Sequence, residues 1–277
     1  MNTSVPDVSP HLSGAAAPGS DAGVAAALTL TGERTIPDLE IENYWFRRHQ
    51  VVYRRFAPLC AGREVLEAGC GEGYGADLIA GVARRVVAVD YDEAAVAHVR
   101  SRYPRVEVMQ ANLARLPLPD ASIDVVVNFQ VIEHLWDQGQ FVAECARVLR
   151  PSGRLMMSTP NRITFSPGRD TPVNPFHTRE LNAAELAELL VAGGFAEPAV
   201  SGVFHGPRLR EMDARHGGSI IDAQIERAMA ADPGAPWPPQ LAADVAAVTT
   251  DDFDLVEAGD GRDIDDSLDL VAIAVRP

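Results

Sequence analysis

The stretch Glu67–Gly75, "EAGCGEGYG", decides the fold of this chain. Glycine occupies every second position from Gly69 to Gly75, after the short predicted strand "EVLEA" and before the helical run "ADLIAGVA". Glycines in such a turn let the backbone approach a ligand closely, and the N-terminus of the following helix carries a partial positive charge. A strand, a glycine turn and a helix in this order predict a ligand site at the edge of a sheet.

Around this turn, predicted strands and helices alternate along the chain. Further strands are predicted at residues 84–92, 105–112, 117–130 and 153–162, and helices at residues 44–56, 76–83, 92–103, 137–150 and 182–195. This alternation is typical of an α/β fold with a Rossmann-like, doubly wound parallel sheet. Asp92 is the predicted N-cap of its helix. An isolated apolar segment at residues 267–277 predicts a last strand.

Two classes of nucleotide-containing ligand fit the glycine turn. Asp90 ends the second strand about 20 residues later, where an acid can accept both hydroxyls of a ribose. Gly71-x-Gly73-x-x-Ala76 satisfies the loose nicotinamide fingerprint, so a nicotinamide oxidoreductase is one interpretation. Glu67, two residues before the first glycine, and Asn112, at the end of the third strand, favour another interpretation.

That second set of residues resembles the class I S-adenosylmethionine (SAM) dependent methyltransferases. The resemblance implies a doubly wound, seven-stranded sheet with an antiparallel last strand. It implies that Glu67 and the glycines hold the methionine end of SAM, that Asp90 holds the ribose, and that Asn112 lies near the adenine. The cofactor-binding residues expected in this way are Glu67, Gly69, Gly71, Gly73, Asp90, Tyr91, Asn112, Leu113 and Asn128.

Three polar residues, Gln130, Glu133 and His134, follow the fourth predicted strand in "NFQVIEHLWD". If the chain becomes helical after Phe129, their spacing places all three on one face. The carboxyl ends of the strands are where doubly wound sheets bind ligands. An amide oxygen, a carboxylate and an imidazole form a partial shell for a divalent metal.

The same stretch resembles the "E-x-x-E-H" motif of the ubiquinone-pathway O-methyltransferases and of the small-RNA 2′-hydroxyl methyltransferases. The resemblance implies a Mg²⁺ or Mn²⁺ site formed by Gln130, Glu133, His134 and the later His177, with Gln130 departing from the glutamate of the motif. The catalytic residues expected are His134, His177 and Glu133. A catalytic base acting without metal and a purely structural role both stay open as alternatives.

Two further segments contain candidate substrate or cofactor contacts. The loop after the fifth strand contains several groups that bind hydroxyls, and these are Asn161, Arg162, Arg169, Asp170, Asn174 and His177. Tyr44 and His49, in the first predicted helix, are candidates for covering the cofactor. Trp237 is interpreted as a buried anchor more readily than as a sugar-stacking residue.

Composition limits the classes of partner. With a net charge of -15 over 277 residues, the chain repels nucleic acid. No segment reaches the roughly 18 apolar residues that a membrane span needs. Three cysteines without a CxxC pair fit a reducing cytoplasm. We expect a disordered tail at residues 1–32 and a methyltransferase domain at residues 33–277, with a helical cover at 33–60 and an insertion at about 206–265.

Beyond the core motifs, nearly the whole chain resembles mycobacterial methyltransferases associated with methylglucose lipopolysaccharide biosynthesis. The segments "LTLTGERTIPDLEIENYWFRRHQVVYRRF" and "HGPRLREMDARHGGSIIDAQI" carry this resemblance. It implies SAM-dependent O-methylation of a sugar hydroxyl in glucose units of an α-glucan, a carbohydrate acceptor. The alternatives are a small-molecule methyltransferase acting on a quinone or lipid phenol and the nicotinamide oxidoreductase.

Overall fold

The computed structural model describes residues 34–169, 171–230, 232 and 235–277. The predicted tail at residues 1–32 and the candidate Asp170 lie outside the described residues. No helix of the described part is long and apolar enough to cross a bilayer.

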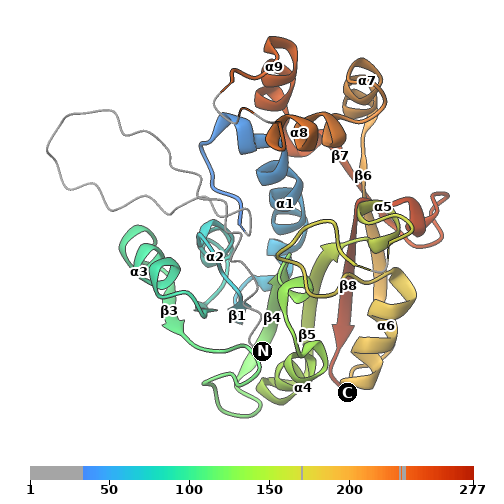
Figure 1. The fold of residues 1–277 in the computed structure, drawn as a ribbon. Helices are drawn as coiled ribbons and strands as arrows, with labels where there is room; N and C mark the ends of the chain where they lie inside the picture. Colours follow the sequence, from blue (N-terminus) through green and yellow to red (C-terminus); the bar gives the residue numbers. More distant parts are fainter. Residues whose placement is uncertain (1–33, 170, 231, 233–234) are drawn as a thin grey trace, which may run out of the picture.

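The described residues form an eight-stranded sheet in the order β3-β2-β1-β4-β5-β8-β6-β7 (Figure 1). The strands β1 to β5 are parallel, and β8 lies antiparallel between β5 and β6. Their bounds are Glu64–Ala68 (β1), Arg85–Asp90 (β2), Glu107–Gln110 (β3), Ile123–Phe129 (β4), Leu149–Pro160 (β5), Ala199–His205 (β6), Phe253–Glu257 (β7) and Asp269–Val275 (β8).

The predicted fold class is confirmed, with one difference in the number of strands. The resemblance implied seven strands, whereas the structure adds β7, which pairs antiparallel with β6 at the edge of the sheet. Its residues belong to the predicted insertion, where the sequence has no clear strand period. The terminal β8 is antiparallel to β5, as expected.

Helices cover both faces of the sheet (Figure 1). Alternate residues of β1 and β4 point to opposite faces, because side chains alternate along a strand. Val65 and Val127 pack on the side of α1 and α2, and Leu66 and Val126 on the side of α4 and α6. These four helices are Asn43–Phe56 (α1), Tyr74–Ala80 (α2), Gln138–Val148 (α4) and Ala183–Ala192 (α6). Parallel strands buried on both faces explain the near-continuous apolar runs in the sequence.

The remaining helical elements are short, and several of them begin at a capping side chain. Asp92 accepts a hydrogen bond from the backbone N–H of Ala94, which confirms the predicted N-cap. The elements are Glu40–Glu42 (η1), Ala57–Cys60 (η2), Glu93–Arg102 (α3), Ile132–His134 (η3), Arg162–Phe165 (α5), Pro207–Arg215 (α7), Ile220–Ala228 (α8), Pro239–Ala247 (α9), Thr250–Asp252 (η4) and Ile264–Asp266 (η5).

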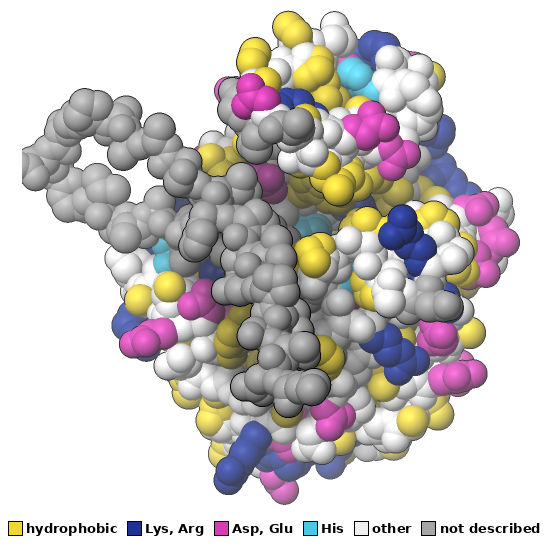
Figure 2. Space-filling model, in the orientation of Figure 1, with side chains coloured by type: hydrophobic (Ala, Val, Ile, Leu, Met, Phe, Trp, Pro, Cys, Tyr) yellow, Lys and Arg dark blue, Asp and Glu magenta, His cyan; other side chains and the backbone are white. Residues whose placement is uncertain are grey.

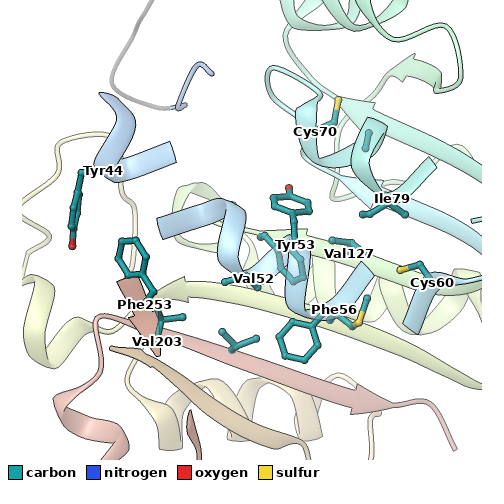
Figure 3. Close-up of a cluster of buried hydrophobic side chains, with 14 of the residues drawn as sticks. Tyr44, Val52, Tyr53, Phe56, Cys60, Cys70, Ile79, Val127, Val203 and Phe253 are labelled. Atoms are coloured by element: carbon teal, nitrogen blue, oxygen red, sulfur yellow. The ribbon is translucent and has the colours of Figure 1, made fainter. Parts of the chain in front are cut away.

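The first long helix, α1, is amphipathic and packs against the sheet. Val52, Tyr53 and Phe56 are buried against side chains of β4 and β6, including Val127 and Val203 (Figure 3). Pro58 follows the helix, where the chain changes to the short η2. At the other end of α1, the Asn43 amide donates hydrogen bonds to three backbone carbonyls at and just after the end of α9, which fixes α9 against the start of α1.

A buried ion pair connects α1 to the last strand. Arg48 donates to both carboxylate oxygens of Asp269, at 2.7 and 2.6 Å, and both side chains are 2% exposed or less. Arg48 also donates to the carbonyl of Leu268. The bidentate geometry and the extra hydrogen bond offset part of the cost of removing two charges from water. This pair fixes α1 beside the end of β5, which pairs with β8.

Removal of one partner leaves the other charge buried and unpaired. We therefore expect Asp269→Asn to lower the free energy of unfolding by about 3–5 kcal/mol, measured by urea denaturation. Arg84, whose side chain pairs with Glu64 at the surface and is 61% exposed, is the control. Arg84→Ala is expected to cost less than about 1 kcal/mol. Equal losses in the two variants would contradict this account of the buried pair.

Candidate functional site

A large cavity lies at the carboxyl ends of β1, β2 and β4. Its volume is about 1010 Å³, at the upper end of the about 300–1,000 Å³ found for ligand pockets. It therefore has space for a nucleotide-sized cofactor beside a second small molecule. The glycine turn forms one wall, and the loop of residues 171–178 forms another.

The glycine turn has the backbone that only glycine adopts without strain. Gly69, Gly71 and Gly73 all have positive φ, between 51° and 96°. A Cβ on Gly69 would lie 2.5 Å from Cγ1 of Val131, in the neighbouring loop. A Cβ on Gly71 would instead enter open space, with its nearest neighbour 3.9 Å away. Gly69 and Gly71 both line the cavity. The missing side chain of Gly69 makes room for Val131, whereas that of Gly71 leaves room for a ligand against the backbone.

Asp90 connects the second strand to this turn and faces the cavity. Its Oδ2 accepts a hydrogen bond from the N–H of Gly71 at 2.8 Å, and its Oδ1 accepts one from the N–H of Asp92 at 3.0 Å. Each carboxylate oxygen can accept a second hydrogen bond. The carboxylate is therefore held in place while lone pairs remain for the two hydroxyls of a ribose.

Glu67 lies beneath the turn rather than in the wall of the cavity. Tyr53, which does line the cavity, donates a hydrogen bond to Oε1 of Glu67 at 2.5 Å. Oε2 of Glu67 is buried and has no partner among the described residues. Burial raises the pKa of this carboxyl to about 8. An unpartnered buried acid next to the cavity fits a cationic group such as the amino group of SAM.

The other expected cofactor residues divide into two groups. Tyr91, Asn112 and Leu113 line the cavity together with the two glycines and Asp90. Gly73 and Asn128 are not among its lining residues. Asn128 is fully buried inside the sheet, where its amide donates to the carbonyl of Ala68. The structure thus gives Asn128 a contact between β4 and β1, and direct cofactor binding by this residue stays only a prediction.

The chain does not become helical directly after Phe129, so the condition that would place Gln130, Glu133 and His134 on one face is not met. Gln130 has a φ of 57°, and only one 3₁₀ turn, η3, follows it. A left-handed residue breaks the helical register that placed Gln130 on one face with Glu133 and His134. The amide of Gln130 lies 3.4 Å from Oγ of Ser158, although the residue still lines the cavity.

His134 lines the cavity, and its Nε2 has no hydrogen-bond partner among the described residues. Its Nδ1 lies 3.0 Å from the carbonyl oxygen of Phe176. Because a carbonyl only accepts, Nδ1 carries the proton and Nε2 of the neutral ring keeps its lone pair. Burial, reinforced by the nearby His177, lowers the pKa of His134 to about 4. His134 is therefore neutral at pH 7 and can accept a proton or bind a metal.

His177 is oriented by two neighbours in its own loop. The N–H of Phe176 donates to Oδ1 of Asn174, so the Nδ2 of Asn174 faces Nε2 of His177 at 3.1 Å. An amide nitrogen only donates, and Nε2 is therefore the acceptor. Nδ1 of His177 then donates to Oε1 of Glu180 at 2.6 Å. The rings of His134 and His177 meet edge to face, with centroids 4.8 Å apart.

Glu133 is buried beside these two histidines. Burial raises the pKa of its carboxyl to about 8, although Oγ1 of Thr159 donates to it at 3.1 Å. One carboxylate oxygen of Glu133 and one nitrogen each of His134 and His177 all lie within 4.8 Å of one another. These three side chains could therefore hold a divalent cation. The carbonyl of Glu133 also accepts from the N–H and Oγ1 of Thr178, which fixes the loop over the cavity.

Several cavity residues have no motif in the sequence. Trp136 and Phe176 both line the cavity, and they are 93% and 43% exposed. Tyr53 reaches the cavity from α1, and Glu180 orients His177 from outside it. A large apolar side chain directly after the "EH" motif is the signal that could have found Trp136. No motif marks Tyr53, whose partner Glu67 lies on another element, or Glu180, although its partner His177 is only three residues away.

The remaining candidates have different positions. His49 lines the cavity, as do Asn174 and His177. Tyr44 is fully buried and shares a hydrogen bond with His205, so it does not cover the cavity. The amide of Asn161 donates to backbone carbonyls of residues 264–267. Trp237 packs against the core.

Comparison with known proteins decides the family. A methyltransferase domain is matched at residues 66–157. A "probable S-adenosylmethionine-dependent methyltransferase" of Mycobacterium tuberculosis (strain H37Rv) is 77% identical over 273 residues, which are 99% of this chain and 98% of that protein. A relative from Mycolicibacterium smegmatis with the same description is 74% identical over 257 residues, 93% of this chain and 98% of that protein. The chain belongs to the SAM-dependent methyltransferases.

A solved structure agrees on the fold of this methyltransferase. A SAM-dependent methyltransferase of Thermotoga maritima superposes with a TM-score of 0.56 at 18% identity, covering 84% of this chain and 93% of that one. Family membership also decides between the two interpretations of the glycine turn, in favour of SAM and against a nicotinamide cofactor. When bound, SAM supplies a methyl group on a sulfonium for transfer to a nucleophile.

The raised pKa of Glu67 predicts how stability depends on pH. Because the folded state binds this proton more tightly than the unfolded state, the stabilisation is complete below the ordinary value of 4.5 and is lost as pH rises through about 8. We expect the free energy of unfolding of the wild type to fall over this range. In Glu67→Gln the fall should be smaller by at least about 1 kcal/mol. Urea denaturation at a series of pH values measures both.

The raised pKa of Glu133 also makes the free energy of unfolding fall as pH rises. The pH dependence of Glu67→Gln is therefore weaker than that of the wild type, but it does not disappear. Glu188 of α6, which is exposed, is the matched control, and Glu188→Gln is expected to follow the wild-type curve. Parallel curves for wild type and Glu67→Gln would show that the Glu67 carboxyl titrates at its ordinary value.

Proposed function

We propose that this methyltransferase transfers the methyl group of SAM to a hydroxyl of a sugar. The observation that carries the proposal is the free Nε2 lone pair of His134, which faces the same cavity as the glycine turn and Asp90. A sugar hydroxyl is a poor nucleophile at neutral pH, and its proton must leave as it attacks. A neutral imidazole beside the acceptor is suited to take that proton.

The environment of His134 both helps and limits this role. A pKa of about 4 keeps Nε2 unprotonated at pH 7, but it also makes the ring a weak base. The difference from the ordinary pKa of 6.5 corresponds to about 3 kcal/mol against protonation. Ionisation of the neighbouring Glu133 would favour the protonated ring, since opposite charges attract at short range. Proton transfer to His134 is therefore expected to depend on Glu133.

A divalent cation is a second way to activate the hydroxyl, and the residues present fit one. Glu133, His134 and His177 would hold it, and the metal would lower the pKa of the bound hydroxyl. Two imidazoles and one carboxylate suit Mn²⁺ better than Mg²⁺, which prefers oxygen ligands. His177 would first have to give up the hydrogen bond that Asn174 donates to Nε2. Gln130 stays a predicted fourth ligand.

The residues on the acceptor side of the cavity favour a carbohydrate as the acceptor. The loop of residues 171–178 contributes the hydroxyls of Thr171 and Thr178 and the amide of Asn174. Trp136 presents a flat, exposed ring on which the apolar face of a pyranose can stack. The resemblance described above extends the proposal to glucose units of an α-glucan, within methylglucose lipopolysaccharide biosynthesis in the cytoplasm. A quinone or lipid phenol is the alternative acceptor.

Radiolabelled SAM offered to α-glucan and mannan oligosaccharides, with a quinol and a phenol in parallel, tests the proposal. We expect methyl transfer to a sugar hydroxyl. Transfer to the phenolic acceptors alone would identify the alternative function. Binding of S-adenosylhomocysteine without turnover of any acceptor would contradict both.

The histidine cluster predicts the outcome of two substitutions. General-base assistance contributes about 10²–10⁴ in rate, so His134→Ala and His177→Ala are expected to lower kcat by at least about 100-fold. His216 pairs with Asp244 outside the cavity, and His216→Ala is the matched control with near wild-type kcat. Binding of Mn²⁺, followed by its electron paramagnetic resonance signal, is expected to be lost in the same two variants.

Chelation separates the two mechanisms. If EDTA leaves kcat unchanged while both histidine variants are inactive, His134 acts as a base without metal. Full activity of both variants, with and without EDTA, would remove the cluster from the mechanism.

Because Trp136 is proposed to stack on the sugar, we expect its removal to change only the affinity for the acceptor. Loss of one stacked aromatic ring costs about 1–2 kcal/mol, so Trp136→Ala is expected to raise KM for the sugar about tenfold. The kcat and the affinity for S-adenosylhomocysteine should stay within about twofold of wild type. Trp136→Phe should restore most of the loss, and Met229→Ala, a change at another exposed apolar residue outside the cavity, should have no effect. An unchanged KM in Trp136→Ala would exclude stacking.

A further inference from the structure

A second, smaller cavity adjoins the large one. Its volume is about 270 Å³, just below the about 300–1,000 Å³ typical of pockets for a whole ligand. Thr171, Pro172 and Thr178 line both cavities, so the same loop separates them. His177 faces the large cavity, and its partner Glu180 faces the second cavity. The second cavity therefore suits one small group of a molecule whose other part lies beside His177.

Three arginines and two glutamates line the second cavity, and the two glutamates already have partners. Glu185 is paired with Arg162 at 3.2 Å and also accepts from the N–H of Asn182 at the start of α6. Glu180 accepts from the imidazole of His177 at 2.6 Å through Oε1, whereas its Oε2 is buried without a hydrogen-bond partner among the described residues.

The other two arginines, Arg169 and Arg179, are different. Both side chains are exposed, and within the described part of the chain neither guanidinium has a hydrogen bond or a close ion pair, although Arg179 helps to lower the pKa of the Glu185 carboxyl. Both side chains line the second cavity, and dark-blue side chains lie over α5 and the loop that follows it in Figure 2. Most arginines of this acidic chain have a carboxylate or carbonyl partner, such as Arg48 and Arg147. The cavity therefore has three arginines against two glutamates, an excess of one positive charge in a chain of net charge -15.

The chemistry of this cavity indicates its ligand. The planar guanidinium presents paired N–H donors that match the oxygens of a carboxylate or a phosphate. Overall negative charge repels anions at long range, so an anion would bind here only through these local contacts. A neutral sugar ring could also accept hydrogen bonds from arginine, but it would leave the excess positive charge of the cavity uncompensated.

We propose that the second cavity binds a carboxylate or phosphate group carried by the acceptor whose hydroxyl is methylated in the large cavity. This inference rests on the proposed sugar methyltransferase function and adds an anionic group to its substrate. Arg169 and Arg179 hold the anion, and the loop between the cavities places the neighbouring sugar beside His134 and His177. The anion then sets which hydroxyl of the sugar meets the methyl donor.

Matched acceptors that differ in one anionic group test this inference. Wild-type enzyme is compared on α-glucose 1-phosphate and methyl α-glucoside, and on the same pair in the mannose series. Two charged hydrogen bonds predict a kcat/KM at least about tenfold higher for the phosphorylated member. The double variant Arg169→Ala/Arg179→Ala is expected to abolish this ratio, because it lowers kcat/KM for the phosphorylated acceptor far more than for the neutral one. Arg100→Ala, in α3 at the other end of the molecule, is the control (Figure 1).

Each result has one interpretation. Equal kcat/KM for the two acceptors, or an equal loss on both in the double variant, assigns the cavity to a neutral unit and overturns the inference. If calorimetry shows that inorganic phosphate binds, but kcat/KM shows no preference between the two acceptors, the cavity binds a free anion. That result also overturns the inference. Methylation of no sugar at all contradicts the proposed function. In that case, binding of inorganic phosphate to the wild type and its loss in the double variant still support an anion site. If the wild type does not bind phosphate, an anion site is excluded.

Discussion

The parallel pairing of β1 with β2 on one side and with β4 on the other is the constraint on which the cavity depends. Glu67 is level with Ala88 on β2 and with Val127 on β4, so the three strands end at the same edge. Parallel strands bring their carboxyl ends together, whatever the length of chain between them. The glycine turn, Asp90 and the "IEH" turn therefore meet, although they span residues 69–134.

Elements outside this sheet edge close the cavity. The bidentate pair of Arg48 with Asp269 holds α1 in place, and α1 brings His49 and Tyr53 to the cavity wall. On the opposite side, the carbonyl of Glu133 accepts two hydrogen bonds from Thr178 and so anchors the loop that contains His177. The "IEH" turn and the loop of residues 171–178 are thus joined through the backbone as well as through side chains.

Local patterns predicted the sheet, the helices and the turn because each depends on neighbours in sequence. Asp92 caps its helix through an N–H two residues later, and the glycines are required by their own φ angles. The condition of a helix directly after Phe129 is not met for a tertiary reason. Gln130 has left-handed backbone, and its N–H pairs with the carbonyl of Ser158 on β5, which spacing along one segment does not reveal.

The sequence alone determined a doubly wound α/β chain with a SAM-type glycine turn, an acid after the second strand and a histidine motif after the fourth. These are properties of short segments with a fixed order. Only the tertiary structure decided that Nε2 of His134 has no hydrogen-bond partner among the described residues, that Trp136 is exposed at the cavity, and that Arg169 and Arg179 line a second cavity. Such facts depend on hydrogen bonds and burial between segments that are distant in sequence, and so they exist only once the strands have paired.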